Sequence, residues 1–362
     1  ETISDATLVE ENGPDLFVAG SDLLQKALYA GLVDNQVTYS EAESDNIPQK
    51  AFDAATCDGK LIGYPFYFES CFLLYNQYYA EDWPRNIDQI LEYADNFENT
   101  GVTEKVQNIF KWDVSDIFYN YFFIGNYVGL GGTYGDEKSQ LSLSEGKVID
   151  CLEYYQSLNE FFAIDEETVH SEDVIQEFID GKTIYTIATS DCIRKIDQAA
   201  ADGEFKYEYG VAKLPNINSE LVTKGMSITD TLVINGYSDH KASASEFVKY
   251  LVNEQNSDLF EMTGKISAVK QENYSDKHVE GFVMNYEDSV PIPKMVDTSN
   301  FWVELEICFA KIWNGTDANT QLRMLSEKIK TQLAGSPVEE VPIEDPKVEL
   351  LPAVEYEEIV EG

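Results

Sequence analysis

The 362-residue sequence predicts a mixed α/β protein with a substantial folded core. From residue 14 onward, short apolar runs alternate with amphipathic stretches at helical spacing, which is typical of α/β domains rather than helical bundles or β-sandwiches. Hydrophobic residues make up 43% of the chain and aromatic residues 12%, so burial can offset the conformational entropy lost on folding. A chain of this length has room for two or three domains.

The first predicted unit is a strand followed by a helix. Residues 16–19 are a short apolar run, typical of a buried strand. Ser21 is expected to cap the N-terminus of the next helix, and Gly31 to end that helix. Residues 60–75 contain two apolar runs joined through a proline and Glu69, and are too long and interrupted for one strand. We therefore expect a segment there that crosses between two parts of the fold.

Helices and strands continue to alternate along the rest of the chain. Apolar spacing predicts helices over 144–162, 174–179, 241–262 and 316–333, and another that begins at Asp191. Strands are predicted over 183–189, 209–214 and 231–234. The glycine-rich residues 129–132 match no dinucleotide- or phosphate-binding pattern, so we expect a loop that ends a helix.

The charge of the chain excludes some partners. Asp and Glu number 66 against 25 Lys and Arg, a net charge of −41, which repels phosphate backbones and anionic lipids. Nucleic-acid and membrane-surface partners are therefore not expected. From Ser336 the chain holds nine acidic residues, one lysine and four prolines without helical periodicity. This composition predicts an extended acidic tail.

No motif for metal or nucleophilic catalysis is evident. The five cysteines lie far apart, and the three histidines lack metal-binding spacing, so we expect no metal and no other cofactor. The cysteine count leaves the disulfide state open. Carboxylate pairs of the kind used by glycoside hydrolases cannot be judged among 66 acids, so that enzyme class stays open.

The aromatic residues of one segment are the most specific chemical feature. Flat rings can stack on the apolar faces of sugars, and carboxylates accept hydrogen bonds from sugar hydroxyls. The segment could therefore line a sugar-binding cleft, although pattern alone favours packing in the core. The segment contains Trp112, Phe118, Tyr119, Tyr121, Phe122, Phe123 and Tyr127.

Five short segments carry a resemblance to a known family. They are GPDLFVAGSD at 13–22, DGKLIGYPFYFES at 58–70 with LLYN at 73–76, FIDGKTIYTI at 178–187, YGVAKLP at 209–215 and PIPKMVDTSNFW at 291–302. In this order they resemble the extracellular solute-binding proteins of ABC sugar importers, in particular the maltose- and maltodextrin-binding group. The resemblance implies a two-lobed, periplasmic-binding-protein-like fold of type II, with hinge segments crossing between the lobes and a sugar cleft between them.

The resemblance also implies how the chain is divided. The family's opening strand-helix-strand unit has no counterpart here, because only twelve residues precede Gly13. We expect the mostly parallel first sheet to be rearranged around residues 16–19, or completed by a segment outside these 362 residues. The implied parts are 1–68 and 231–276 for the N-terminal lobe, 69–230 and 277–335 for the C-terminal lobe, and 336–362 for the tail.

Ligand-binding residues follow from the same resemblance. Asp22 and Glu69 match acids that hydrogen-bond sugar hydroxyls, and Trp302 matches a ring on which a glucose unit stacks. In the aromatic segment two registers are open, which place either Asp116 and Phe118, or Tyr119 and Tyr121, in the acid and ring positions. The predicted set is completed by Ser21, Trp112, Asp191 and Ile292.

Two stacking platforms of the family are absent from this chain. Ala19 and Asp191 stand where the family often has tryptophan. Each missing stacking face removes about 1 kcal/mol of binding free energy unless the tyrosine-rich segment compensates.

The sequence therefore predicts a non-catalytic protein that captures an oligosaccharide, most simply a maltodextrin or another α-glucan, for ABC import. We expect a monomer outside the cell, periplasmic or anchored at the surface, with a permease or other cell-surface modules as partners. We also expect the lobes to close on the ligand. A glycan- or starch-adhesion protein with the same fold and a glycoside hydrolase remain as alternatives.

Overall fold

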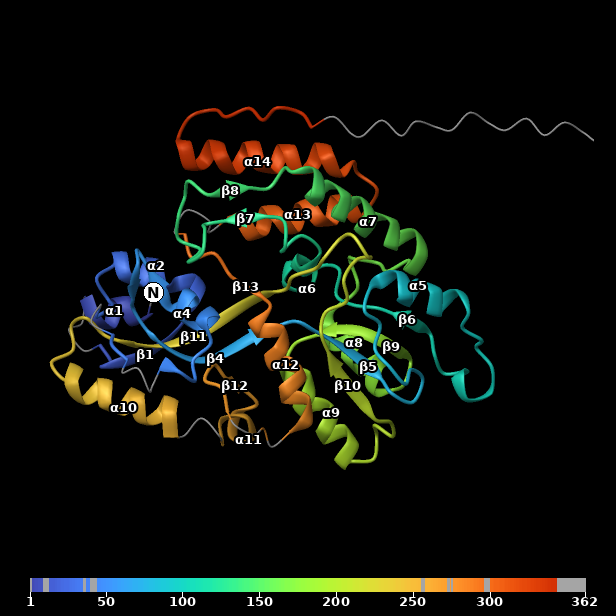
Figure 1. Cartoon of the computed structure of the whole chain (residues 1–362), viewed down its shortest axis with the longest axis horizontal. Helices are drawn as coiled ribbons and strands as arrows, with labels where there is room; N and C mark the ends of the chain where they lie inside the picture. Colours follow the sequence, from blue (N-terminus) through green and yellow to red (C-terminus); the bar gives the residue numbers. More distant parts are fainter. Residues whose placement is uncertain are drawn as a thin grey trace, which may run out of the picture.

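Two β-sheets, joined by segments that cross between them, organise the fold (Figure 1). The computed structural model describes residues 2–8, 13–34, 37–39, 44–254, 258–271, 274, 276–295 and 300–343.

The first sheet has the strand order β1 (Leu16–Gly20), β11 (Met226–Ile234), β4 (Tyr64–Ser70) and β12 (Ile266–Ser267). All three of these pairings are antiparallel, and only the short β13 (Val290–Pro291) runs parallel to its partner β11. The expectation of a mostly parallel sheet is therefore wrong for the described strands. The reason is that β11 lies centrally between β1 and β4 and runs opposite to both.

Helices cover this sheet and follow its strands. Helices α4 (Gln49–Ala55) and α10 (Lys241–Glu254) pack against β4 and β11. Helix α2 (Leu24–Tyr29) follows β1 and packs with it in a small hydrophobic cluster. Helix α1 (Thr2–Leu8) lies beside β1, and α11 (Leu259–Thr263) beside β12 (Figure 1).

The second sheet has the order β10 (Tyr209–Ala212), β5 (Phe72–Asn76), β9 (Thr183–Ala188) and β6 (Asn108–Phe110). Every residue of β5 and β9 is buried, as expected for central strands covered on both faces. Helices α5 (Ile87–Asp95), α8 (Ser171–Ile179) and α9 (Asp191–Ala201) surround this sheet (Figure 1). Helix α12 (Lys277–Glu287) packs against both β10 and β4, so it spans the two sheets.

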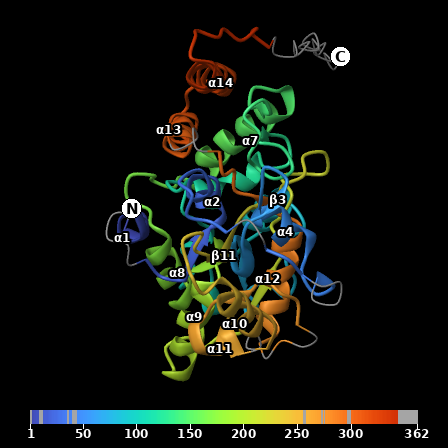
Figure 2. The ribbon, with the colours of Figure 1, turned by 90° about the vertical axis from the view of Figure 1, so that its left-hand side faces the viewer.

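A third group of helices lies at one end of the molecule in both Figure 1 and Figure 2. It consists of α7 (Gly146–Phe162), α13 (Phe301–Trp313) and α14 (Ala318–Ala334), which pack together. The hairpin of β7 (Gly129–Leu130) and β8 (Leu141–Ser142) runs alongside them. Their apolar faces and the second sheet share one large hydrophobic core.

Most of the predicted elements are confirmed. The strand at 16–19, the strands β9, β10 and β11, and the helices α7, α8, α9 and α14 all lie where the patterns place them. The predicted crossing within 60–75 is also confirmed, because β4 ends at Ser70 in the first sheet and β5 begins at Phe72 in the second. The chain therefore passes from one sheet to the other at Cys71.

Three local predictions are wrong. Ser21 begins a 3-10 turn and does not cap a helix, because its hydroxyl accepts a hydrogen bond from the Thr229 backbone N–H at 3.2 Å. The glycines at 129–132 belong to a β-hairpin, where Gly131 and Gly132 have the positive φ angles that its turn requires. The single helix predicted over 241–262 is described as α10 and α11, and residues 255–257 between them lie outside the described residues.

The start of the predicted tail packs against α14. The Val338 N–H donates to Thr331 Oγ1 at 2.9 Å, and the Asn319 side-chain amide donates to the Ile343 carbonyl oxygen at 2.8 Å. This segment has no helix or strand, as the composition predicts, but it is attached to the fold. Residues 344–362 of the predicted tail lie outside the described residues.

Strand β1 forms one end of the first sheet. Among the described residues it pairs with β11 alone, from Leu16 opposite Ile234 to Gly20 opposite Asp230. No other described strand lies on its far side, so the described chain supplies no central strand in place of the family's opening unit. None of the helices in the described ranges is both long and apolar enough to span a membrane.

Candidate ligand-binding site

Glu69 connects the two sheets next to the point where the chain crosses between them. Its carboxylate accepts hydrogen bonds from the Ser190 backbone N–H at 3.0 Å, the Ser190 hydroxyl at 2.6 Å and the Ser70 N–H at 3.1 Å. Ser190 follows β9, so these bonds join the end of β4 to the second sheet. Burial raises the pKa of Glu69 to about 7, and the hydrogen bonds from Ser190 oppose that rise.

Half-buried polar side chains continue from Glu69 across the first sheet. Tyr67 lies opposite Asp230 in the pairing of β4 with β11, and side chains two residues apart on a strand share a face. Tyr67, Glu69 and Asp230 therefore form one surface of the sheet. The Lys265 ammonium group lies 5.5 Å from the centre of the Tyr67 ring. Burial raises the pKa of Asp230, Lys265 lowers it, and Asp22 adds to the rise.

Asp22 lies in the 3-10 turn Ser21–Leu23 that directly follows β1. Its carboxylate folds back over Gly20, where a Cβ atom would come within 2.5 Å of Asp22 Oδ1. Glycine at position 20 therefore makes room for this orientation of the acid. Burial raises the pKa of Asp22, while the backbone N–H groups of Asp22 and Leu23 lower it. Asp22 is close enough to Asp230 to raise the pKa of that acid.

The turn after β9 supplies polar groups from the second sheet. The Thr189 hydroxyl donates to Asp191 Oδ1 at 2.5 Å and lies 3.2 Å from the Tyr119 hydroxyl. Asp191 is exposed, and Tyr119 is half-buried. Burial raises the pKa of Tyr119, so its hydroxyl stays protonated and can donate a hydrogen bond.

The aromatic segment meets the crossing through α6 (Ile117–Asn120). Asp116 caps this short helix by accepting a hydrogen bond from the Phe118 N–H at 2.8 Å. The Phe118 carbonyl oxygen accepts a bond from Cys71 Sγ at 3.4 Å, and Cys71 is the residue at which the chain crosses between the sheets. Asp116 and Phe118 are both half-buried. Burial raises the pKa of Asp116, and the neighbouring Asp113 adds to the rise.

Trp302 reaches the same region from α13. Its ring is half-buried and lies edge-on to Tyr121, with ring centres 5.9 Å apart. Glu306 lies one helical turn farther along α13 and is linked to α6 by a hydrogen bond from the Ile117 backbone N–H. Burial raises the pKa of Glu306, and Asp116 adds to the rise. Helix α13 therefore places Trp302 and Glu306 beside the start of α6.

Four of the predicted ligand-binding residues lie in the interior instead. Trp112 is 0% exposed, and its indole N–H donates to Asn120 Oδ1 at 2.9 Å within the core. Ser21 is 0% exposed, Tyr121 3% and Ile292 7%. Side chains this deeply buried support the surface residues and present little area to a ligand. The structure thus brings Glu69, Asp116, Phe118, Tyr119 and Asp191 together at the crossing, with Asp22 on the first sheet and Trp302 on α13.

Several residues of this region were not predicted from the sequence. Asp230 could have been noticed, because it is the single charged residue within 226–234. Tyr67, Ser190, Lys265 and Glu306 give no comparable local signal. Their places depend on the pairing of β4 with β11 and β12, and on the packing of α13.

Two groups in the described residues have the geometry to hold a metal ion, and both lie away from this region. Cys57, Asp58 and Asp136 form one group, and Asp197, Asp276 and His278 the other. In the second group, both ring nitrogens of His278 already have a polar neighbour. One lies 2.8 Å from Asp276 Oδ1 and the other 3.2 Å from the Tyr209 carbonyl oxygen.

In the first group, the buried Lys294 supplies a positive charge close to Cys57 and Asp136. All five cysteines are free and buried.

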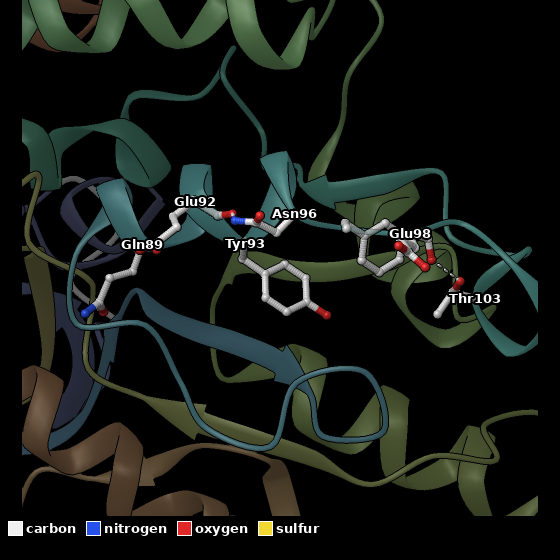
Figure 3. A pocket seen from close by; sticks show the side chains of 7 residues that line it. Gln89, Glu92, Tyr93, Asn96, Glu98 and Thr103 are labelled. Atoms are coloured by element: carbon white, nitrogen blue, oxygen red, sulfur yellow. Dashed lines mark hydrogen bonds between the residues drawn. The ribbon is translucent and has the colours of Figure 1, made fainter.

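A further pocket lies on α5 and the loop after it, lined among others by Gln89, Tyr93, Asn96 and Thr103 (Figure 3). The side chains drawn there come from a single helix and the turn that follows it, and none belongs to the region around Glu69. The charged residues in its lining are two glutamates, Glu92 and Glu98. The pocket shares no lining residue with the site at the crossing.

Two sheets joined by crossing segments, with half-buried acids and rings where they meet, define the architecture of a two-lobed binding protein. Comparison with known proteins supports this description. The chain belongs to the bacterial extracellular solute-binding protein family, whose profile matches residues 3–279. It is similar to the maltodextrin-binding protein MdxE of Bacillus subtilis (strain 168), with 22% identity over 338 residues that cover 88% of this chain and 78% of that protein.

Solved structures share the fold. An extracellular solute-binding protein from Staphylococcus aureus, in complex with maltose, superposes with a TM-score of 0.80 at 19% identity, covering 92% of this chain and 87% of that chain. A cyclo/maltodextrin-binding protein in complex with maltotetraose has a TM-score of 0.78 at 19% identity, covering 92% and 86%. The predicted family and two-lobed fold are therefore confirmed.

Proposed function

We propose that the protein captures an α-glucan oligosaccharide of the maltodextrin type between its two lobes and delivers it to an ABC permease. The observation that carries this proposal is the meeting of half-buried acids and aromatic rings at the crossing, centred on Glu69. The known relatives add weight, because one is named a maltodextrin-binding protein and two similar structures hold maltose or maltotetraose.

The chemistry of the region suits a neutral sugar. Ionised carboxylates accept hydrogen bonds from hydroxyl groups, and bonds to charged groups contribute about 1.5 to 3 kcal/mol each. The raised pKa values of Asp22, Asp116 and Asp230 reflect burial, so these acids have already lost part of their hydration. Hydroxyl groups of a sugar could replace the remaining water, while Phe118 and Trp302 offer apolar ring faces.

Each of the two large sheets forms the centre of one proposed lobe. We place the first lobe around the first sheet and the second lobe around the second, with crossings at Cys71, between β10 and β11, and between β13 and α13. The last of these crossings lies later in the chain than the boundary at 276 that the family resemblance implies, because β13 pairs with β11 of the first sheet. A ligand at Glu69 would touch groups from both sheets. Such a ligand favours the closed arrangement, since a population shift requires contacts that differ between the two states.

The family consists of solute-binding proteins, and we extend that role to this chain as binding without turnover. Glu69 has the raised pKa of a possible proton donor. However, its oxygens already accept three hydrogen bonds from Ser70 and Ser190. This environment is better suited to a fixed acceptor than to a group that exchanges protons with a glycosidic oxygen.

The test is calorimetric titration with maltose, maltotriose and maltotetraose, together with an assay for new reducing ends. We expect saturable binding of one sugar per chain and no reducing ends. Release of reducing ends would make the protein a glycoside hydrolase. Binding to insoluble starch without binding to any of the soluble sugars would make it an adhesion protein instead.

A further inference from the structure

A second hollow lies behind the crossing segment that links β10 to β11. It has a volume of about 250 Å³, enough for a small molecule of a few non-hydrogen atoms. Its walls come from the loop before α5, the segment 213–225 and the C-terminal end of α12. None of its lining residues belongs to the candidate sugar site.

The charge of this hollow is opposite to that of the chain. Arg85, Lys213 and Lys224 line it, against the single acid Asp288. The whole chain, by contrast, has 25 basic and 66 acidic residues. Two of the three cations have an acidic partner, because Arg85 pairs with Asp82 at 3.3 Å and Lys213 with Asp288 at 3.4 Å.

One lysine of the lining, Lys224, has a second lysine, Lys50, near it outside the lining. Among the described residues, the ammonium groups of Lys224 and Lys50 form no ion pair. Lys50, on α4, is close enough to Lys224 to feel its charge. Burial lowers the pKa of Lys50, and the charge of Lys224 lowers it further. Asp53 and Asp288 raise this pKa in turn, so acids partly offset the repulsion between the two lysines.

The other groups in the lining suit an anion as well. Lys213 contacts Asp288 at 3.4 Å, a distance too long for a strong hydrogen bond. The guanidinium of Arg85 lies 3.4 Å above the Trp83 ring, which holds it flat at the rim. Asn216 accepts a bond from the Thr223 N–H through its carbonyl oxygen, and in the described part of the chain its side-chain N–H groups have no partner.

We propose that this hollow binds a small anion that carries phosphate or carboxylate oxygens. Lys224, Lys213 and Arg85 neutralise the anion, and the Asn216 amide donates to one of its oxygens. The nearby Asp288 selects against weakly charged anions, because only a ligand with more than one negative charge outweighs it. The Lys50 charge adds attraction from α4. This site is independent of the proposed sugar site.

The test is calorimetry at low ionic strength with inorganic phosphate and with citrate as probes. The full chain is titrated alongside Lys224→Met, Lys224→Arg and Lys147→Met. The last variant removes the same charge from an exposed position on α7 and serves as the control. Thermal unfolding and maltotetraose titration of each variant show whether it is folded.

At least one probe is expected to bind the unmodified chain with one site per chain. Lys224→Met should weaken that binding by roughly tenfold, equivalent to 1.4 kcal/mol. Lys224→Arg should stay close to the unmodified chain, and Lys147→Met should not change. The proposal is overturned if neither probe binds saturably up to about 10 mM, a limit of roughly −3 kcal/mol, or if Lys224→Met and Lys147→Met have equal effects in folded protein.

Discussion

The two sides of the candidate site differ in chemistry and in how they are held. The first sheet presents the carboxylates of Glu69 and Asp230 from paired strands, where backbone pairing fixes their spacing, and that of Asp22 from the turn after β1. The opposite side presents the rings of Phe118, Tyr119 and Trp302 from the helices α6 and α13, with Asp116 and Asp191 as its acids. The acids can orient a sugar through its hydroxyls, and the rings can supply contact area. We therefore expect mutations on the two sides to differ in their pH dependence.

The largest expected effect is a loss of stability when an aromatic ring of the core, rather than one of the candidate site, is removed. Trp112→Ala should lower the free energy of unfolding by about 3 to 5 kcal/mol, because it removes a fully buried ring. The ring packs 4.6 Å from Phe110 and 5.7 Å from Trp313. Urea unfolding measures the loss, and calorimetry on the folded variant should give unchanged sugar affinity. A folded Trp112→Ala protein with weakened sugar binding would move Trp112 into the site.

Trp302→Ala should weaken maltotetraose binding by about 1 to 3 kcal/mol, as is usual for an aromatic residue central to an interface. Its ring is half-buried and is held beside Tyr121. Phe161→Ala, which removes an exposed ring on α7, is the matched control and should leave affinity unchanged. Equal affinities for the two variants would show that Trp302 only packs against Tyr121 and Phe301.

Glu69→Gln should change how stability depends on pH. The folded state holds the Glu69 proton more tightly than the unfolded chain, with a pKa of about 7 against an ordinary 4.5. Between these values the unfolded state gains from ionisation, so the unmodified protein loses stability as pH rises. The variant lacks this loss. The free energy of unfolding of the variant, relative to that of the unmodified protein, should therefore rise by about 1 to 3 kcal/mol between pH 4.5 and 7.5. Urea unfolding at several pH values measures it, and parallel profiles for the two proteins would contradict the account.

The smallest effect compares two acids of the first sheet. Asp22→Asn and Asp230→Asn should each weaken sugar binding by about 1 kcal/mol, since an amide accepts weaker hydrogen bonds than a carboxylate. Asp34→Asn, at a position outside the site, is the control. Because Asp22 raises the pKa of Asp230, the double variant should lose less than the sum of the two single losses. A strictly additive loss would place the two acids in separate environments.

The sequence was most informative where a local pattern determines the structure. Apolar runs located β1 and β9, and the interrupted run at 60–75 located the crossing, because strand burial and chain breaks are short-range features. The antiparallel order of the first sheet was not predictable in this way. It depends on β11 returning between β1 and β4 after the chain has formed all four strands of the second sheet.

The site was predictable only in part for the same reason. Motifs pointed to Asp22, Glu69 and Trp302, but Trp112 and Trp302 look alike in sequence. The packing of α7, α13 and the aromatic segment buries Trp112 in the core and leaves Trp302 half-buried. Asp230 belongs to the candidate site because β11 pairs with β4, more than 150 residues away in the chain. A local sequence pattern cannot predict a pairing between segments so far apart.

The central claim is that one oligosaccharide contacts both sheets at the crossing. A crystal structure of the complex with maltotetraose tests it most directly. The account predicts sugar hydroxyls hydrogen-bonded to Asp22 or Glu69, and a glucose ring stacked on Trp302. Sugar bound to one sheet alone, or away from Glu69 and Trp302, would contradict the account.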